Sequence, residues 1–112
     1  MSDFQLLTVS TEDRGTDVVA TVSGELDFGT TNDLLAAGEP VVSAGRALIL
    51  DLAGLSFCDS SGLGALVQLH RAADAAGGSL TLAAPQPRVE SVLRVTMLHK
   101  LLTVVDRVPA GS

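Results

Sequence analysis

The part of this 112-residue chain best suited to chemistry is residues 57–64, which read Phe-Cys-Asp-Ser-Ser-Gly-Leu-Gly. An apolar run ends there and a helical pattern begins, so Asp59, Ser60 and Ser61 are all candidates for the helix N-cap. The two glycines of the segment fall in the first helical turn, where each costs about 1 kcal/mol relative to alanine. Helix stability therefore does not explain this segment.

Glycine beside a serine suits modification by another protein. It removes side-chain bulk around the hydroxyl, so a second protein can approach the backbone, and the free N–H groups of a helix start accommodate an anion. These features predict a phosphorylation site at Ser60. The alternative is that Ser60 only caps the helix, which is the commoner role of an isolated Asp-Ser-Ser-Gly.

Catalytic uses of Ser60 are disfavoured by the residues around it. A nucleophile elbow needs Gly-x-Ser-x-Gly, and Cys58 occupies the first glycine position. His70 lies about 15 Å of helical rise away, and His99 has no fixed relation to Ser60. The chain also has no Gly-x-x-x-x-Gly-Lys-Ser/Thr loop, and its one cysteine and two histidines are not at metal-ligand spacing. We therefore expect no enzyme, no cofactor and no metal site.

The elements that must position this segment begin with a hairpin and a helix. Residues 5–11 and 18–23 are rich in β-branched residues and flank a polar stretch with a glycine, which predicts two antiparallel strands. Residues 30–33 offer N-cap chemistry ahead of an apolar stripe that ends near Gly45, which predicts the first helix. Pro40 lies inside this helix, so we expect a kink or an early break there.

The rest of the chain alternates strands and helices. Residues 47–52 are almost continuously apolar, which is typical of a strand with parallel neighbours. Residues 60–76 carry a helical stripe closed by two glycines. A strand at 79–84, a helix at 85–96 and a strand at 102–106 follow. Right-handed crossovers between neighbouring strands place all helices on one face. We therefore predict an α/β fold, with a mixed sheet, an N-terminal antiparallel hairpin and helices mainly on one face.

Composition limits the chain to one domain and excludes several partners. The length suits a single domain spanning residues 1–112, with its core at about 5–106 and a short tail at 107–112, and 46% apolar residues supply that core. Seven basic against 13 acidic residues, a net charge of −6, disfavour direct binding of nucleic acid. A single cysteine, no secretory leader and no membrane-length apolar run predict a cytoplasmic protein without a membrane span.

Three motifs stand in a characteristic order along the chain. They are Gly24-Glu25-Leu26-Asp27 followed by Thr31, Leu50-Asp51-Leu52, and residues 57–64. Together with the element order, these motifs resemble the STAS-domain anti-sigma factor antagonists of bacteria over about residues 5–106. The resemblance favours phosphorylation over simple capping for Ser60.

The resemblance implies a binding protein controlled by phosphorylation. In such antagonists the unmodified protein binds an anti-sigma factor, itself a serine kinase that uses ATP, and so frees a sigma factor for transcription. The kinase then phosphorylates the first serine of Asp-Ser-Ser-Gly, here Ser60, and a serine phosphatase reverses the modification. Carried over to this chain, Asp27 belongs to a loop beside that serine, while Asp59, Ser61 and Gly62 complete the partner-binding rim.

Further expectations concern residues near these motifs. Leu63 and Val67 lie one helical turn apart and flank the buried stripe, so they form either an apolar patch for the partner or the rim of the core. We expect Cys58 to be buried rather than to sense redox state. Residues 96–98 read Thr-Met-Leu where the family often has a glycine, so the turn into the last strand is expected to differ.

The resemblance also leaves a second class of function open. Some STAS domains act as ligand sensors or scaffold modules without control by a kinase. The intact Ser60 favours the kinase-switched form, which we expect to be a monomer or a weak dimer.

Overall fold

The computed structural model describes residues 7–111 and contains one five-stranded mixed sheet, in the order β1-β2-β3-β4-β5. The strands are β1 (Leu7–Asp13), β2 (Asp17–Leu26), β3 (Ala47–Cys58), β4 (Ser79–Ala83) and β5 (Thr103–Val105). β1 and β2 pair antiparallel, and β2 to β5 run parallel. The sheet confirms the predicted N-terminal hairpin. Residues 5 and 6, the start of the first predicted strand, lie outside the described residues.

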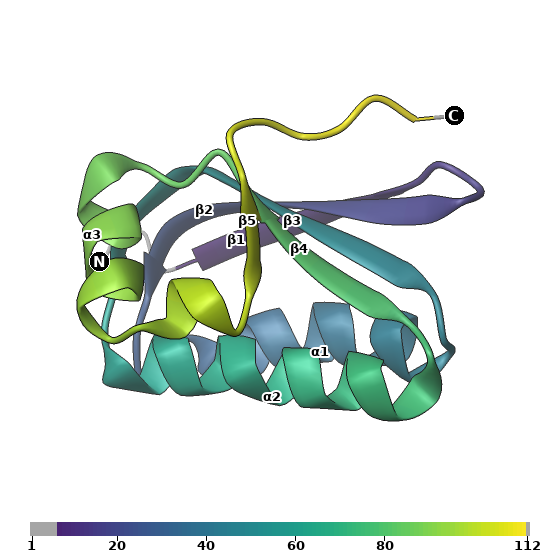
Figure 1. The fold of residues 1–112 in the computed structure, drawn as a ribbon, viewed down its shortest axis with the longest axis horizontal. Helices are drawn as coiled ribbons and strands as arrows, with labels where there is room; N and C mark the ends of the chain where they lie inside the picture. The colour runs from purple at the N-terminus through teal and green to yellow at the C-terminus, as the bar shows by residue number, and fades with distance from the viewer. Residues whose placement is uncertain (1–6, 112) are drawn as a thin grey trace, which may run out of the picture.

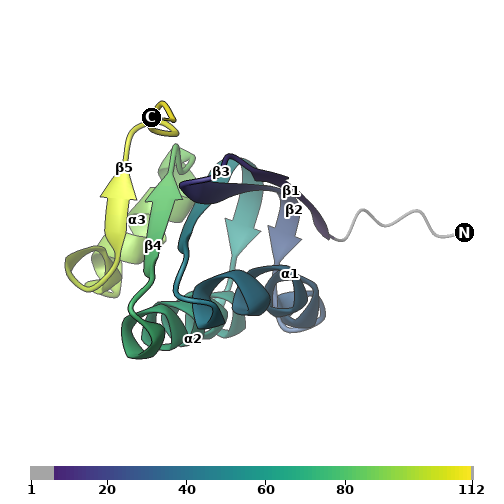
Figure 2. The same ribbon diagram turned by 90° about the vertical axis from the view of Figure 1, so that its right-hand side faces the viewer.

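Three α-helices pack on one face of this sheet. They are α1 (Thr31–Ser43), α2 (Ser60–Ala76) and α3 (Pro87–Val95), with a short 3-10 helix η1 (Leu98–Lys100) before β5. α1 and α2 lie side by side beneath the sheet (Figures 1 and 2). All three helices contribute to one core cluster, through Leu34, Val42, Leu66, Leu69, Val89 and Leu93 among others. The predicted placement of the helices is therefore confirmed, because each joins neighbouring strands by the same crossover.

The opposite face of the sheet carries a smaller cluster that the chain end covers. Val19, Ile49 and Ala83 are buried there, with Val105 and Val108 packed against them. The segment after β5 runs along this side, away from α1 and α2 (Figure 1). The end of the chain is thus part of the packed structure, although its sequence predicts only a short tail.

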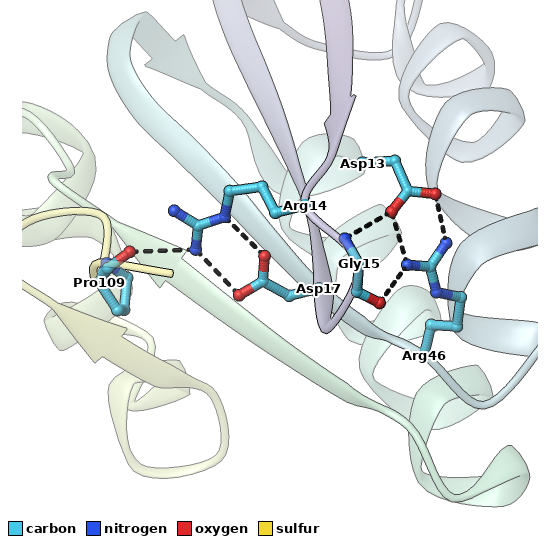
Figure 3. Close-up of polar contacts among 6 residues, drawn as sticks. All are labelled: Asp13, Arg14, Gly15, Asp17, Arg46 and Pro109. Carbon is cyan, nitrogen blue, oxygen red and sulfur yellow. Dashed lines mark hydrogen bonds and ion pairs between the residues drawn. The ribbon is translucent and has the colours of Figure 1, made fainter. Parts of the chain in front are cut away.

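Ion pairs hold the hairpin turn to its neighbours (Figure 3). Arg14 pairs with Asp17, with 2.6 Å between Nε and Oδ1, and donates a hydrogen bond of 3.0 Å to the carbonyl of Pro109. Arg46, just before β3, makes a two-pronged pair with Asp13 at 2.7 and 2.8 Å. The turn is therefore tied both to β3 and to the chain end.

β3 continues to Cys58, whereas the apolar run predicts an end at Leu52. The second half of the strand contains small and polar residues, so its hydropathy does not indicate a strand. The pairing with β2 also shifts register there. Gly54 lies against Ser23 in this part of the sheet, and a methyl group on Gly54 would require the hydroxyl of Ser23 to move. The longer strand delivers Asp59 directly to the edge of the sheet.

The predicted early break of the first helix at Pro40 is wrong. α1 continues through this residue to Ser43. Proline removes the hydrogen bond to the carbonyl four residues earlier, here that of Ala36. Both residues are exposed, so water can satisfy that carbonyl without loss of the helix.

The turn into β5 uses a backbone conformation that glycine favours. Met97 has a φ of 64°, in the left-handed region, and precedes η1. This region costs a side-chain-bearing residue about 1–2 kcal/mol. At residues 96–98, where the resemblance leads one to expect a glycine, the turn therefore contains a methionine with a strained backbone.

Candidate functional site

The candidate site lies at the edge where β2 and β3 end. These strands run parallel, and their last paired residues are Leu26 and Cys58. Asp27 and Asp59 are the next residues along the chain. They lie at the same edge of the sheet, because the carboxyl ends of adjacent parallel strands meet there. The backbone N–H of Asp59 also donates a hydrogen bond of 3.1 Å to the carbonyl of Leu26. The loop that carries Asp27 therefore lies against the start of α2.

Asp59 caps α2 and holds the neighbouring loop at the same time. Its backbone is extended, and its Oδ1 accepts a hydrogen bond of 2.9 Å from the N–H of Gly62. Its Oδ2 accepts one of 3.3 Å from the N–H of Phe28, in the loop between β2 and α1. One carboxylate thus joins the two segments that form the site.

Ser60 is the first residue of α2 and is not its cap. Its side chain is exposed, whereas Ser61 is half-buried. Within residues 7–111 no group hydrogen-bonds the Ser60 hydroxyl. The capping hydrogen bond of the helix, from the N–H of Gly62, goes to Asp59 instead. The interpretation of Ser60 as a simple cap is therefore wrong, because Asp59 holds that position.

The two glycines of the first turn have different surroundings. Gly62 is buried, and a methyl group on it would lie 2.7 Å from the carbonyl oxygen of Leu26 and 2.9 Å from Sγ of Cys58. Gly64 is exposed, and a methyl group there would have nothing within 4 Å. Packing of the helix on the sheet requires the first glycine, and nothing in the fold requires the second.

Burial corrects two of the predicted partner contacts. Leu63 is only 7% exposed and belongs to the core, and Gly62 is buried beneath the helix. Both lie on the inward face, because the first turn of α2 packs directly on the end of β2. Val67 is half-buried and remains available at the surface. Of the two alternatives given for these residues, burial therefore favours the core for Leu63 and leaves Val67 as the apolar candidate at the surface.

The loop between β2 and α1 has a backbone fixed by side chains. Oδ1 of Asp27 accepts a hydrogen bond of 2.9 Å from the N–H of Gly29. The hydroxyl of Thr30, which is 2% exposed, accepts one of 2.9 Å from the N–H of Asp27 and donates one of 2.9 Å to the carbonyl of Glu25. Phe28 projects from this ordered loop and is 83% exposed.

Sequence reasoning missed the parts that Thr30 and Phe28 play in this loop. Thr30 resembles an ordinary N-cap, but its side chain makes no capping bond to α1. Phe28 is one of only three aromatic residues in the chain and falls in a polar helix-start segment. An aromatic residue within such a polar segment is the signal that could have identified Phe28 as a candidate.

The charge around the site is acidic, and its cysteine is inert. No lysine or arginine occurs in residues 15–45 or 47–70, which supply the whole site. Cys58 is buried, as expected, and burial together with the charge of Asp59 raises the pKa of its thiol to about 12. The thiol is therefore protonated at neutral pH, and thiolate chemistry is absent from the site.

Comparison with known proteins decides the family. The profile of the STAS domain matches residues 8–110. The chain belongs to the STAS domain family. A curated relative of this STAS domain, the anti-sigma F factor antagonist of Paenibacillus polymyxa, is 26% identical over 91 residues, which are 80% of this chain and 78% of that protein.

Solved structures agree with this assignment. An anti-sigma factor antagonist from Mycobacterium paratuberculosis superposes with a TM-score of 0.79 at 29% identity, covering 88% of this chain and 85% of that one. Unphosphorylated SpoIIAA, also an anti-sigma factor antagonist, gives a TM-score of 0.72 at 27% identity, with 87% of each chain covered. The phosphorylated form of SpoIIAA, from Bacillus, gives 0.67 at 26% identity, covering 87% of this chain and 90% of that one.

The relatives named here as anti-sigma factor antagonists are 26–29% identical to this STAS domain. The STAS domain family is not enzymatic. Within the described residues, no helix has both the length and the apolar character needed to cross a membrane.

Proposed function

We propose that this STAS domain is an anti-sigma factor antagonist that phosphorylation of Ser60 switches off. The unmodified domain, as a monomer or weak dimer, binds an anti-sigma factor that is also a serine kinase, and the bound sigma factor is released. Oγ of Ser60 then takes the γ-phosphoryl group of the kinase's ATP, ADP leaves, and the hydroxyl proton passes to a base of the kinase. A serine phosphatase hydrolyses the phosphoserine and restores binding.

The state of Ser60 is the observation that carries this proposal. Its hydroxyl is exposed at the first position of α2, while Asp59 provides the cap. A phosphate there adds roughly 1.5 to 2 negative charges at neutral pH, and the helix dipole stabilises it by about 0.3–1 kcal/mol. Modification therefore leaves the fold intact. A related protein, SpoIIAA, is known in both unphosphorylated and phosphorylated forms.

The effect of the phosphate falls on binding. A partner that docks against the neutral Ser60 hydroxyl must, after modification, strip water from a dianion beside Asp59 and the Asp27 loop. Repulsion and desolvation of this kind cost on the order of 1–3 kcal/mol. At about 1.4 kcal/mol per decade, the affinity falls roughly tenfold to hundredfold.

Mass spectrometry after a kinase reaction tests the proposed site. Each anti-sigma factor kinase of the same genome is incubated with the domain and ATP, and the modified peptide is sequenced. We expect one phosphate, on Ser60, with one of these kinases. Ser61→Ala is the matched control and should still be modified, whereas Ser60→Ala should not.

Two outcomes of this reaction contradict the proposal. A phosphate on Ser61 would assign the switch to the wrong residue. An unmodified domain with every kinase would instead favour a STAS sensor or scaffold module that no kinase controls.

A further inference from the structure

Phe28 is the most exposed aromatic residue within residues 7–111. It is 83% exposed, so little of its apolar surface is removed from water by folding. No other part of the described chain covers it. The fold therefore gains little from Phe28, and its apolar surface is available to another protein.

The backbone under Phe28 is already ordered. Its own N–H donates to Asp59, the N–H of Gly29 donates to Asp27, and the hydroxyl of Thr30 accepts from the N–H of Asp27. An aromatic ring on a fixed loop loses little conformational freedom on binding, which is the property of an interface anchor.

One exposed face of α2 lies next to this loop. Ser60, Gly64 and Val67 are spaced i, i+4 and i+7, so they share a face of the helix. Asp59 links the start of that face to the backbone of Phe28. We call Phe28, Ser60, Gly64 and Val67 the docking surface. The bare Gly64 in its middle lets a partner approach the helix closely.

We infer that Phe28 is the apolar anchor by which the docking surface binds the anti-sigma factor. The inference rests on the proposed function and adds the residue that dominates recognition. Because the segments that build the site contain acidic residues and no lysine or arginine, the complementary partner surface is an apolar pocket for a phenyl ring with a basic rim.

This charge pattern is consistent with a switch at Ser60. Glu25 in β2 and Asp33 in α1 belong to the elements that flank the Phe28 loop, and both are exposed, so their charges keep their water. A phosphate on Ser60 lies inside the contact and must lose its water. Acidic groups on these flanking elements therefore favour encounter, and the same charge at Ser60 opposes docking.

Binding of purified anti-sigma factors of the same genome to Phe28→Ala tests the anchor. We expect the dissociation constant of the unphosphorylated domain to rise roughly tenfold to hundredfold, as for a central aromatic residue of an interface. Phe28→Tyr, which keeps the ring, should bind within a few-fold of wild type. The melting temperature should not change, because the ring is exposed.

Leu101→Ala is the matched control. Leu101 is a 47% exposed apolar residue that precedes β5, three strands from β2 and at the opposite end of its strand. Its loss should leave affinity unchanged. Phe28→Ala that binds like wild type, or Leu101→Ala that weakens binding equally, would overturn the anchor and leave the proposed function standing. A wild-type domain that binds no anti-sigma factor would overturn both.

Discussion

Gly62 and Gly64 lie in the same helical turn, but their surroundings differ. The first lies against the carbonyl oxygen of Leu26, and the second faces open space. Sequence reasoning treats them alike, since both lower helix propensity. Only the structure shows that one serves internal packing, while the other leaves the exposed face of α2 bare beside Ser60.

Alanine at these two positions should change stability in opposite directions. Gly62→Ala should lower the free energy of unfolding by about 1–3 kcal/mol, because its methyl group overlaps rigid backbone. Gly64→Ala should raise it by up to about 1 kcal/mol through better helix propensity. Urea unfolding of the two variants measures both changes. Equal shifts in the same direction would contradict the packing described for α2.

Prediction of the site residues succeeded where local chemistry decides and failed where long-range contacts do. Residues 59–62 predict a helix start, but Asp59, Ser60 and Ser61 are all possible N-caps. The choice of Asp59 depends on the end of β3 and on the loop that carries Phe28. These contacts join residues about thirty positions apart, which no local pattern reports.

At the scale of elements, the hairpin turn depends on two carboxylates. The guanidinium of Arg46 holds the pKa of Asp13 well below its usual value, and that of Arg14 lowers the pKa of Asp17. A carboxylate with a lowered pKa in the folded state stabilises the fold above its unfolded pKa of about 4 and loses that effect as pH falls. The joint between the hairpin and β3 should therefore weaken in acid.

Arg46→Gln isolates this effect. Wild type should be more stable than the variant at pH 7. The difference should shrink as pH falls below about 4, because the carboxylate of Asp13 then binds a proton in the unfolded chain before it does so in the fold. Urea midpoints at pH 3 to 7 measure it. Arg71→Gln is the control, since Arg71 forms no ion pair within residues 7–111. A difference between wild type and Arg46→Gln that stays constant with pH would contradict the assignment.

The order of elements follows from hydropathy, but their lengths do not. The apolar run ends at Leu52, while β3 continues through small and polar residues because β2 pairs with it to Cys58. α1 continues through Pro40 because the carbonyl of Ala36, which has no hydrogen bond from Pro40, is exposed to water. In both cases tertiary surroundings outweigh the local preference, and those surroundings are not visible in a window of sequence.

The whole molecule keeps its two sheet faces for different purposes. The helices bury one face, and the end of the chain covers Val19, Ile49 and Ala83 on the other. Right-handed crossovers made the first arrangement predictable. The second rests on contacts of Val108 and Pro109 with the hairpin and β3, far away in sequence. The edge that carries Ser60 and Phe28 lies outside both clusters, and both residues are exposed there.

The affinity of the domain for its anti-sigma factor in each state of Ser60 tests the central claim most directly. Isothermal titration of wild type, Ser60→Ala, Ser60→Asp and the phosphorylated domain gives four dissociation constants. Wild type and Ser60→Ala should bind alike, while Ser60→Asp and the phosphorylated domain should bind roughly tenfold to hundredfold more weakly. Equal affinity in all four, with a partner that binds wild type, would contradict a switch at Ser60.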